Sequence, residues 1–297
     1  MRRPPALPRP LHWVLATAIA AASLPAAALD VDTLWDFGQP ALSEQRFRAA
    51  LADAHGDDVL ILRTQIARTK GLRGDFDGAL AELAAIEPQL AKAGPEASVR
   101  FLLERGRARI SPVHDDAART PQALATARAD YLAAAELARR SGLDGLAVDA
   151  LHMMAFVDRD PAGALRWTQQ ALDLAMASPQ PAARAWQASL RNNLGNALHD
   201  LGRHDEAVAQ FRSALALRIE RGRPERIADA RFALGWALRE AGQLDEALAI
   251  QTALDQAATA AGRPDAEVLE ELEAIHHARG DDAAADEIAA RRRALRP

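Results

Sequence analysis

Two asparagines and a histidine recur at helical spacing in the second half of the sequence. Asn192, Asn196 and His199 stand at i, i+4 and i+7, so they share one face of a helix. A side-chain amide donates and accepts hydrogen bonds at once, which lets a row of amides pair with the backbone of an extended peptide. The chemistry that these residues offer is therefore recognition by hydrogen bonds.

About forty residues later, the corresponding positions hold Phe232, Trp236 and Arg239. Aromatic side chains beside an arginine are typical of the centre of a protein interface. We predict that Asn192 and Asn196, together with these three residues, contact a partner. Because large aromatic side chains are mostly buried, packing of Phe232 and Trp236 between neighbouring repeats is the alternative.

Other polar clusters do not build a recognisable catalytic or metal site. His276 and His277 are adjacent, so on a helix they point about 100° apart, and Glu273 with His277 lacks a third ligand. The sequence has no Gly-x-Ser-x-Gly elbow, no His-Glu-x-x-His and no phosphate-binding glycine loop. We therefore expect a non-enzymatic protein with no catalytic residue, no metal and no cofactor.

Two further charged groups have structural explanations. His114, Asp115 and Asp116 lie in a stretch rich in turn residues, so we expect a solvated loop. Arg291, Arg292 and Arg293 (the triplet 291–293) stand near the end of the sequence, where cations complement the dipole of a last helix. Contact of this triplet with an anionic lipid surface is the alternative.

The composition predicts an all-helical protein. Hydrophobic residues make up 49% of the 297 positions but aromatic residues only 4%, so alanine and leucine dominate. Runs of β-branched residues are nearly absent, which argues against a sheet. The net charge of −5 argues against non-specific binding of nucleic acid.

The first 28 residues have the organisation of a secretory signal. Arg2, Arg3 and Arg9 precede a moderately long apolar stretch, and Ala26-Ala27-Ala28 supplies small residues before a cleavage point. The apolar stretch is shorter than the roughly 20 residues that span a bilayer, although an uncleaved anchor is the alternative. The chain has no cysteine, which excludes disulfides and a lipid-modified N-terminal cysteine. We expect a periplasmic or secreted protein.

An internal repeat organises the rest of the chain. Residues 202–215 and 242–254 both begin with glycine and carry Asp-Glu-Ala at the same offset, and the preceding segments also match. With Ala207 as a marker, the matching unit has Ala247 at the equivalent position, and weaker copies have Ala79, Ala127, Ala164 and Ala285 there.

Each repeat is predicted to form two antiparallel helices. Leu190, Leu194 and Leu198 form the apolar face of a first helix, and Gly202 follows at the position where a left-handed backbone ends it. Glycine in mid-helix costs about 1 kcal/mol relative to alanine, so Gly195 needs a packing reason.

We expect Gly195 to face Ala207, and Gly235 to face Ala247, which would let the two helices of each unit approach closely.

This pattern resembles the tetratricopeptide repeat family. The match is Leu194-Gly195, Gly202, Ala207, Phe211 and Ala214 in one unit, and Leu234-Gly235, Gly242 and Ala247 in the next. Intervals near 40 residues exceed the usual 34 and look like the lengthened repeats of kinesin light chains.

The resemblance implies an all-α fold, a right-handed superhelical solenoid of about six helical hairpins whose first helices line a concave binding face. In the family, a basic cluster can clamp a partner's terminal carboxylate, but here only Asn193, Asn196 and Arg239 would be available, so we do not expect that specificity.

The domain organisation follows from these patterns. We predict a signal peptide at 1–28, an N-terminal capping helix within 29–59, degenerate repeats over 60–180, and better-matched repeats with a C-terminal capping helix over 181–297. Breaks rich in turn residues are expected at 111–121 and 177–181.

The predicted function is a non-enzymatic scaffold of the cell envelope that binds a peptide or protein segment on its concave face. The alternatives are a helper subunit that docks onto an envelope enzyme complex and a purely structural array that assembles with itself. No membrane span after signal cleavage and no nucleic-acid partner are expected.

Overall fold

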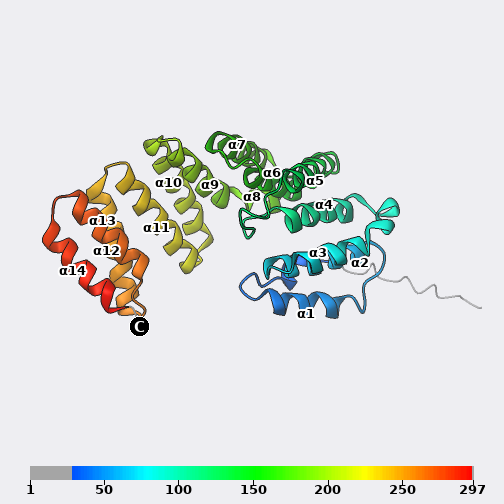
Figure 1. Cartoon of the computed structure of the whole chain (residues 1–297), viewed down its shortest axis with the longest axis horizontal. Coiled ribbons are helices and arrows are strands. Elements are labelled where there is room, and N and C mark those ends of the chain that lie inside the picture. Colours follow the sequence, from blue (N-terminus) through cyan, green and yellow to red (C-terminus); the bar gives the residue numbers. More distant parts are fainter. Residues whose placement is uncertain (1–28, 296–297) are drawn as a thin grey trace, which may run out of the picture.

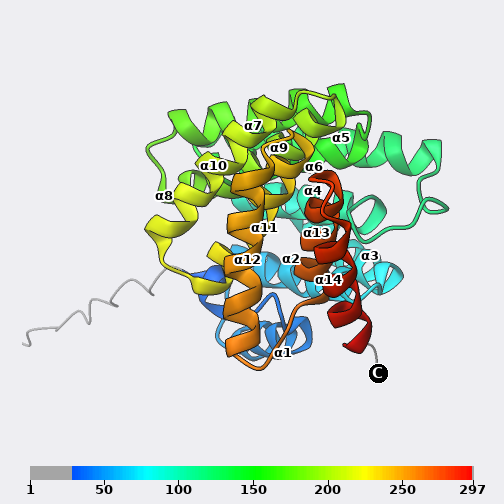
Figure 2. The same cartoon turned by 90° about the vertical axis from the view of Figure 1, so that its left-hand side faces the viewer.

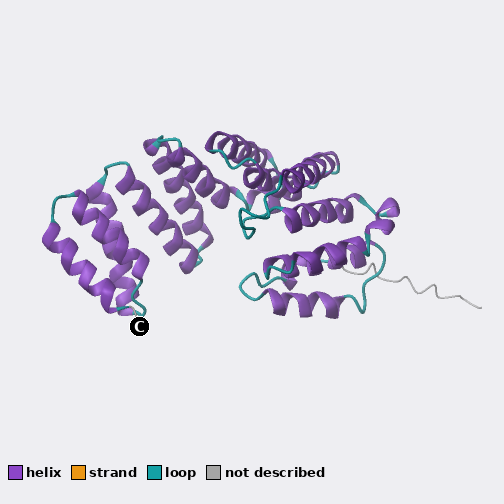
Figure 3. Cartoon of the chain, in the orientation of Figure 1, coloured by secondary structure: helices purple, strands orange, loops and turns teal. Residues whose placement is uncertain are grey.

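The computed structural model describes residues 29–295, and within them every regular element is a helix (Figure 3). The predicted signal peptide lies outside this range. The elements are η1 (Val31–Leu34), α1 (Pro40–Ala50), α2 (Asp57–Leu72), α3 (Phe76–Ala84), η2 (Glu87–Lys92), α4 (Pro95–Arg109), α5 (Pro121–Arg140), α6 (Asp144–Val157), α7 (Pro161–Ala177), α8 (Pro181–Arg184), α9 (Gln187–Asp200), α10 (His204–Arg221), α11 (Pro224–Glu240), α12 (Leu244–Ala260), α13 (Ala266–Ala278) and α14 (Asp282–Ala294). None of the described helices is long and apolar enough to cross a membrane.

Twelve of these helices pair into six hairpins that stack into a curved solenoid (Figure 1). The pairs are α2–α3, α4–α5, α6–α7, α9–α10, α11–α12 and α13–α14. First helices of successive hairpins pack side by side, α2 with α4, α4 with α6, α9 with α11 and α11 with α13. Among the described helices, successive second helices do not make comparable contacts, so the first helices are the more closely spaced ones and line the inner side of the curve. In the end-on view of Figure 2, the C-terminal hairpins lie in front of the N-terminal ones.

The marker alanines lie near the starts of the second helices. Ala79, Ala127, Ala207, Ala247 and Ala285 are at most 1% exposed, and Ala164 is half-buried. The residue four positions later is also buried in each unit, and this position holds Leu83, Tyr131, Thr168, Phe211, Gln251 and Ala289. The repeat found in the sequence thus marks the buried face of the second helix in each hairpin.

The atoms nearest to one glycine in each of three first helices belong to large side chains of the second helices. A Cβ on Gly195 would lie 2.7 Å from Cε2 of Phe211, and one on Gly235 would lie 2.6 Å from Nε2 of Gln251. Phe211 and Gln251 therefore come closest to these two glycines, and the expectation that Gly195 faces Ala207 and Gly235 faces Ala247 stays a prediction. The absent side chain makes room for a bulky one four positions after the alanine. Gly106 and the ring of Tyr131 repeat this arrangement in α4 and α5.

The turn inside the hairpins has the geometry predicted for Gly202. Gly202 has φ of 72°, a left-handed conformation that costs glycine little. Its N–H donates to the carbonyl of His199 at 2.7 Å, and the N–H of Arg203 donates to the carbonyl of Leu198 at 2.9 Å. These two bonds form a Schellman motif, which satisfies carbonyls at the end of α9.

The apolar core is continuous along the array. A central cluster extends from Val99 on α4 to Ile275 on α13, and a second cluster joins Phe47 on α1 to α2, α3 and α4. Leu102 packs against both clusters. The helix α1 therefore covers the N-terminal end of the solenoid, within the predicted capping segment, and α2 begins at Asp57.

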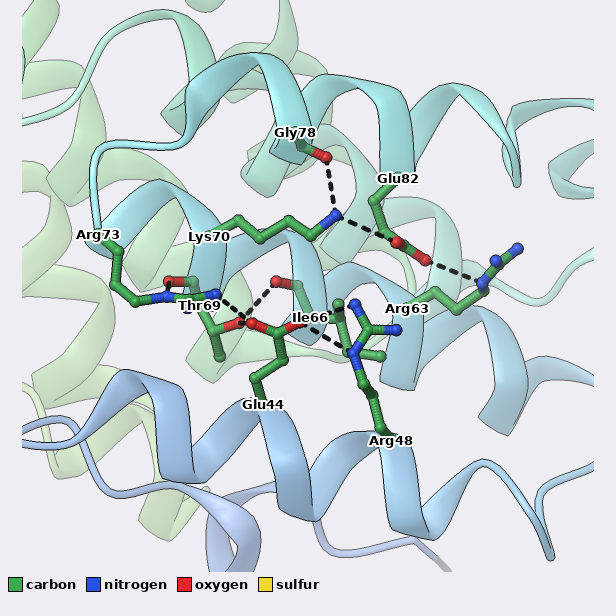
Figure 4. A network of polar contacts seen from close by, with 9 residues as sticks. All are labelled: Glu44, Arg48, Arg63, Ile66, Thr69, Lys70, Arg73, Gly78 and Glu82. Carbon is green, nitrogen blue, oxygen red and sulfur yellow. Dashed lines mark hydrogen bonds and ion pairs between the residues drawn. The ribbon is translucent and has the colours of Figure 1, made fainter.

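Ion pairs on the N-terminal hairpin hold α1, α2 and α3 together (Figure 4). Glu44 on α1 accepts from Arg48 at 2.7 Å and from Arg73, which follows α2. On the other side of α2, Lys70 lies 3.5 Å from the Glu82 carboxylate of α3. These charges supplement the apolar contacts of the cap.

The predicted breaks correspond to interruptions of the helical stack. A long connection joins α4 to α5 between residues 109 and 121, and the second break separates α7, which ends at Ala177, from the single turn α8, which begins at Pro181. Ser178 lies in this second break, where its hydroxyl donates to the carboxylate of Asp144 at 2.6 Å. The segment is therefore tied back to the preceding hairpin.

Candidate functional site

Four of the five predicted contact residues line one open hollow on the inner side of the solenoid. Asn192 and Asn196 come from α9, and Phe232 and Trp236 come from α11. The remaining wall includes three carboxylates of α13, namely Glu267, Glu270 and Glu271, and the hollow measures about 530 Å³. We call it the aromatic hollow. Its walls combine amides, two aromatic rings and negative charge.

Trp236 and Phe232 each use one side for packing. The Trp236 ring lies 4.3 Å from the His199 ring and meets the Phe211 ring edge-on at 6.0 Å, centroid to centroid. Phe232 packs against the apolar cluster of α13. Both side chains are half-buried, and each still lines the aromatic hollow. Packing and partner contact are therefore compatible at these two positions.

Arg239, the fifth predicted contact, is engaged inside the chain. Its Nε donates to Oε2 of Glu271 at 2.8 Å, and its Nη2 donates to Oε1 of the same carboxylate at 3.1 Å. Glu240 lies 2.7 Å away on the other side. The hydrogen bond to Glu271 is the main cause that raises the pKa of Arg239 above its usual value. Arg239 does not line the hollow; it orients the Glu271 carboxylate that does.

The three residues considered for a carboxylate clamp are not brought together. Asn193 points the other way, with its Nδ2 3.4 Å from Nδ1 of His152 on α6. Asn196 is exposed, and Arg239 is paired with Glu271. No shared anion site forms from them.

A second cavity, which was not predicted from the sequence, lies farther toward the N-terminus. It measures about 170 Å³ and is lined by α2, α4 and α6 together with Trp186 at the start of α9. Apolar walls come from Leu72, Val113 and Met153. The polar side is a group of buried charges on successive first helices.

Arg107 is the centre of that charge group. On the same helix it donates to Glu104 at 2.5 Å, and it also donates to Asp149 on α6. Nη1 of Arg68 on α2 lies 3.7 Å from Glu104. The pairs connect three consecutive hairpins in a region where a single unpaired charge would be costly.

The environment sets the protonation of Asp149 and His152. Burial alone would raise the pKa of Asp149, but Arg107 and then Arg68 outweigh it and hold the pKa below its usual value. Burial lowers the pKa of His152 to about 4, so this imidazole is neutral at pH 7. The sequence signal for this group was Asp149, the one charged residue in the apolar run 145–157, whereas Glu104 and Arg107 stand in a run that also carries Arg105 and Arg109.

Comparison with known proteins identifies the repeat. A family model described as tetratricopeptide repeat matches residues 186–252, which span α9, α10, α11 and the first part of α12. Residues 186–252 are tetratricopeptide repeats. No curated protein sequence matches the chain.

Solved structures extend the same fold over most of the chain. The apo form of RapI aligns with a TM-score of 0.66 at 13% identity, covering 89% of this chain and 72% of that one. A signal transduction ATPase from Pyrococcus horikoshii with a tetratricopeptide repeat sensor also gives 0.66, at 14% identity, covering 86% of this chain and 39% of that chain. A Rap protein complexed with competence and sporulation factor gives 0.52 at 15% identity, covering 88% and 72%. At these identities the similarity concerns the fold alone.

The aromatic hollow lies within and beside the matched tetratricopeptide repeats. Asn192, Asn196, Phe232 and Trp236 all fall between residues 186 and 252, whereas the carboxylates of α13 follow that segment. The site therefore spans two matched first helices and the first helix of the next hairpin.

The remaining charged groups form contacts within the helical array. His114 is half-buried, because its ring stacks on Phe76 at 3.8 Å, which corrects the expectation of a merely solvated loop. Arg291 pairs with Asp255 at 2.8 Å and Arg292 with Glu273 at 2.9 Å, so two arginines of the triplet 291–293 connect α14 to neighbouring helices.

His276 and His277 also contact the turn after their helix. His277 lies 3.0 Å from Asp282, and His276 lies 3.5 Å from Asp281. Within residues 29–295, no group of three or more His, Cys, Asp or Glu side chains is arranged to hold a metal ion.

Proposed function

We propose that this protein is a non-enzymatic scaffold that binds a peptide or protein segment on the inner face of its solenoid, in the aromatic hollow. The main support for this proposal is that side-chain amides from α9 and aromatic rings from α11 line the same open hollow. Amides bind the backbone of an extended chain through paired hydrogen bonds, and half-buried rings supply apolar contact area.

The helical-repeat fold also supports the binding of a peptide or protein segment on the inner face. The tetratricopeptide repeat family consists mainly of non-catalytic scaffolds, and repeat arrays offer extended concave surfaces for binding. One Rap protein of similar fold was solved in complex with competence and sporulation factor. The aromatic hollow, at about 530 Å³, has room for several side chains of a bound segment.

Selection from a displayed peptide library tests the proposal although the partner is unidentified. The purified chain is the bait, and enriched peptides are then measured against Asn196→Arg, which places a large side chain at an exposed position of the hollow. Arg212→Ala is the control, because Arg212 lies on α10 and pairs with Glu246 of α12, away from the hollow.

We expect peptides that lose at least tenfold in affinity for Asn196→Arg and retain affinity for Arg212→Ala. Peptides that bind both variants equally, or an absence of enrichment, would contradict binding in this hollow.

We also propose that the protein is exported to the cell envelope, on the basis of the basic and apolar pattern of residues 1–28. Fusion of this segment to alkaline phosphatase, which is active only after export, tests it. Activity that disappears when Arg2 and Arg3 are replaced by glutamate supports export, and an inactive wild-type fusion contradicts it.

A further inference from the structure

Five arginines surround a hollow at one edge of the solenoid, next to the aromatic hollow. Arg184 comes from α8, Arg218 and Arg221 from the end of α10, and Arg223 and Arg226 from the start of α11. The other three lining residues are proline, alanine and serine, so the wall contains no carboxylate. This arginine hollow measures about 780 Å³ and occurs in a chain with an excess of acidic residues.

Three of the five arginine side chains of the arginine hollow are held by neutral oxygens. Nε of Arg184 donates to the Ser178 carbonyl at 2.9 Å, and Arg218 donates to the Ser189 hydroxyl at 2.9 Å. Arg221 donates to the Ala185 carbonyl at 2.8 Å. These bonds fix the guanidinium groups in place without neutralising their charge.

Only one carboxylate of the described residues pairs with the group. Asp229 lies 3.6 Å from Arg226, and both side chains are exposed, so this pair is weak. Burial, followed by the nearby Arg221 and Arg226, lowers the pKa of Arg218 below its usual value. An anion placed among these side chains would relieve the repulsion between them.

Helix stability does not explain the whole arrangement. Arg218 and Arg221 stand in the last turn of α10, where a cation complements the helix dipole. Arg223 and Arg226 stand at the start of α11, where the same dipole disfavours a cation. The helix dipole therefore accounts for the first pair and not for the second.

The arginine hollow continues toward the aromatic hollow. A smaller hollow of about 240 Å³ shares Ser189, Arg218 and Arg226 with it and is also lined by Asn192. Asn192 in turn lines the aromatic hollow. A chain bound along α9 and α11 can thus touch the arginines and Trp236 at once, whereas a small ion fills only one end.

We propose that the arginine hollow binds an acidic segment of a partner polypeptide whose following residues lie along α9 and α11 in the aromatic hollow. This inference rests on the proposed function. The guanidinium group of arginine can bind a carboxylate through two parallel hydrogen bonds. Several such pairs would both strengthen the binding of an acidic segment and orient it.

The distance between Arg226 and Trp236 along α11 sets how many residues separate the acidic and apolar parts of the bound segment. Arg226 and Trp236 are separated by about ten helical residues, or ~15 Å at 1.5 Å per residue. An extended peptide covers ~15 Å with about five residues. The partner segment therefore carries acidic residues about five positions from an apolar residue that reaches the rings of Phe232 and Trp236.

Fluorescence anisotropy with designed probes tests this inference on the full chain. The acidic probe is a labelled peptide with three glutamates, a Gly-Ser-Gly spacer and a leucine, and the matched probe has glutamines in place of the glutamates. The double variant Arg223→Glu, Arg226→Glu reverses two exposed charges of the arginine hollow. Arg139→Glu, Arg140→Glu makes the same charge change at exposed positions on α5.

We expect the acidic probe to bind at least tenfold more tightly than the glutamine probe, and its binding to weaken as sodium chloride rises from about 50 to 300 mM. The affinity for the acidic probe should fall at least tenfold in the arginine-hollow variant and less than threefold in the α5 variant. The inference would be overturned if both probes bound equally or neither bound. It would also be overturned if both variants lost the same affinity, or if millimolar inorganic phosphate displaced the acidic probe completely.

The peptide selection separates this inference from the proposed function. Enriched peptides that lack acidic residues, lose affinity for Asn196→Arg and keep it for Arg223→Glu, Arg226→Glu would refute the acidic segment and leave the aromatic hollow as the binding site.

Discussion

The ring of Phe211 on α10 occupies the space that Gly195 leaves open on α9. A methyl group at position 195 would approach Cε2 of that ring to 2.7 Å, closer than carbon atoms pack in proteins. Phe211 is 1% exposed and also meets the Trp236 ring edge-on. One glycine thus positions a buried phenylalanine, and this phenylalanine supports a wall of the aromatic hollow.

Gly195→Ala should destabilise the protein although alanine favours helices. We expect a loss of about 1–3 kcal/mol in the free energy of unfolding, because the added methyl group overpacks the α9–α10 contact. Urea unfolding followed by circular dichroism measures it. Gly71→Ala is the control, because no atom lies within 4 Å of its added Cβ, and it should be neutral or stabilising by up to about 1 kcal/mol. Equal effects of the two substitutions would contradict the packing explanation.

Asp149→Asn should weaken the connection between the second and third hairpins. The change leaves Arg107 buried without its partner on α6, and breaking a buried ion pair in this way costs about 3–5 kcal/mol. Arg212→Ala breaks the exposed pair with Glu246 and should cost less than about 1 kcal/mol. Urea unfolding of both variants at pH 7 tests the contrast, and a loss for Asp149→Asn as small as that for Arg212→Ala would argue against a stabilising role.

The buried imidazole of His152 should make the protein less stable as the pH falls. Its folded pKa of about 4 lies below the usual value of 6.5, so the unfolded chain takes up the proton first. Stability is therefore complete above pH 6.5 and declines toward pH 4, by about 2 kcal/mol between pH 7 and pH 5. The groups around His152 are Asp149 on α6, Arg107 on α4 and Arg68 on α2.

Urea unfolding at pH 7 and pH 5 measures this decline. In His152→Gln the difference between the two pH values should shrink by about 2 kcal/mol, whereas His55→Gln, at an exposed position, should retain it. An unchanged difference in His152→Gln would show that other groups control the acid sensitivity.

The repeat could be predicted from the sequence because it depends on spacing. Alanine, the residue four positions later and the turn glycine recur at fixed offsets, and each offset corresponds to one buried face or one left-handed turn. The close contact of Phe211 with Gly195 was not predicted, because sequence spacing shows which residues are small but not which side chain crosses the helix interface.

The candidate sites were predictable only in part. Asn192, Asn196, Phe232 and Trp236 share the aromatic hollow because helical spacing and the repeat offset together determine their face. The pairing of Arg239 with Glu271 could not be predicted, since it joins residues of different repeats. The arginine hollow was missed for the same reason, because it gathers side chains from the ends of three helices.

Site-specific crosslinking in cells tests most directly whether the inner face of α9 and α11 binds a partner segment. A photo-crosslinking residue replaces Asn196, which is exposed in the aromatic hollow, or Arg212, on the outer helix α10. Mass spectrometry then identifies the crosslinked peptides. We predict that position 196, and not position 212, captures one defined polypeptide segment. The same background of crosslinked proteins from both positions would contradict binding on the inner face.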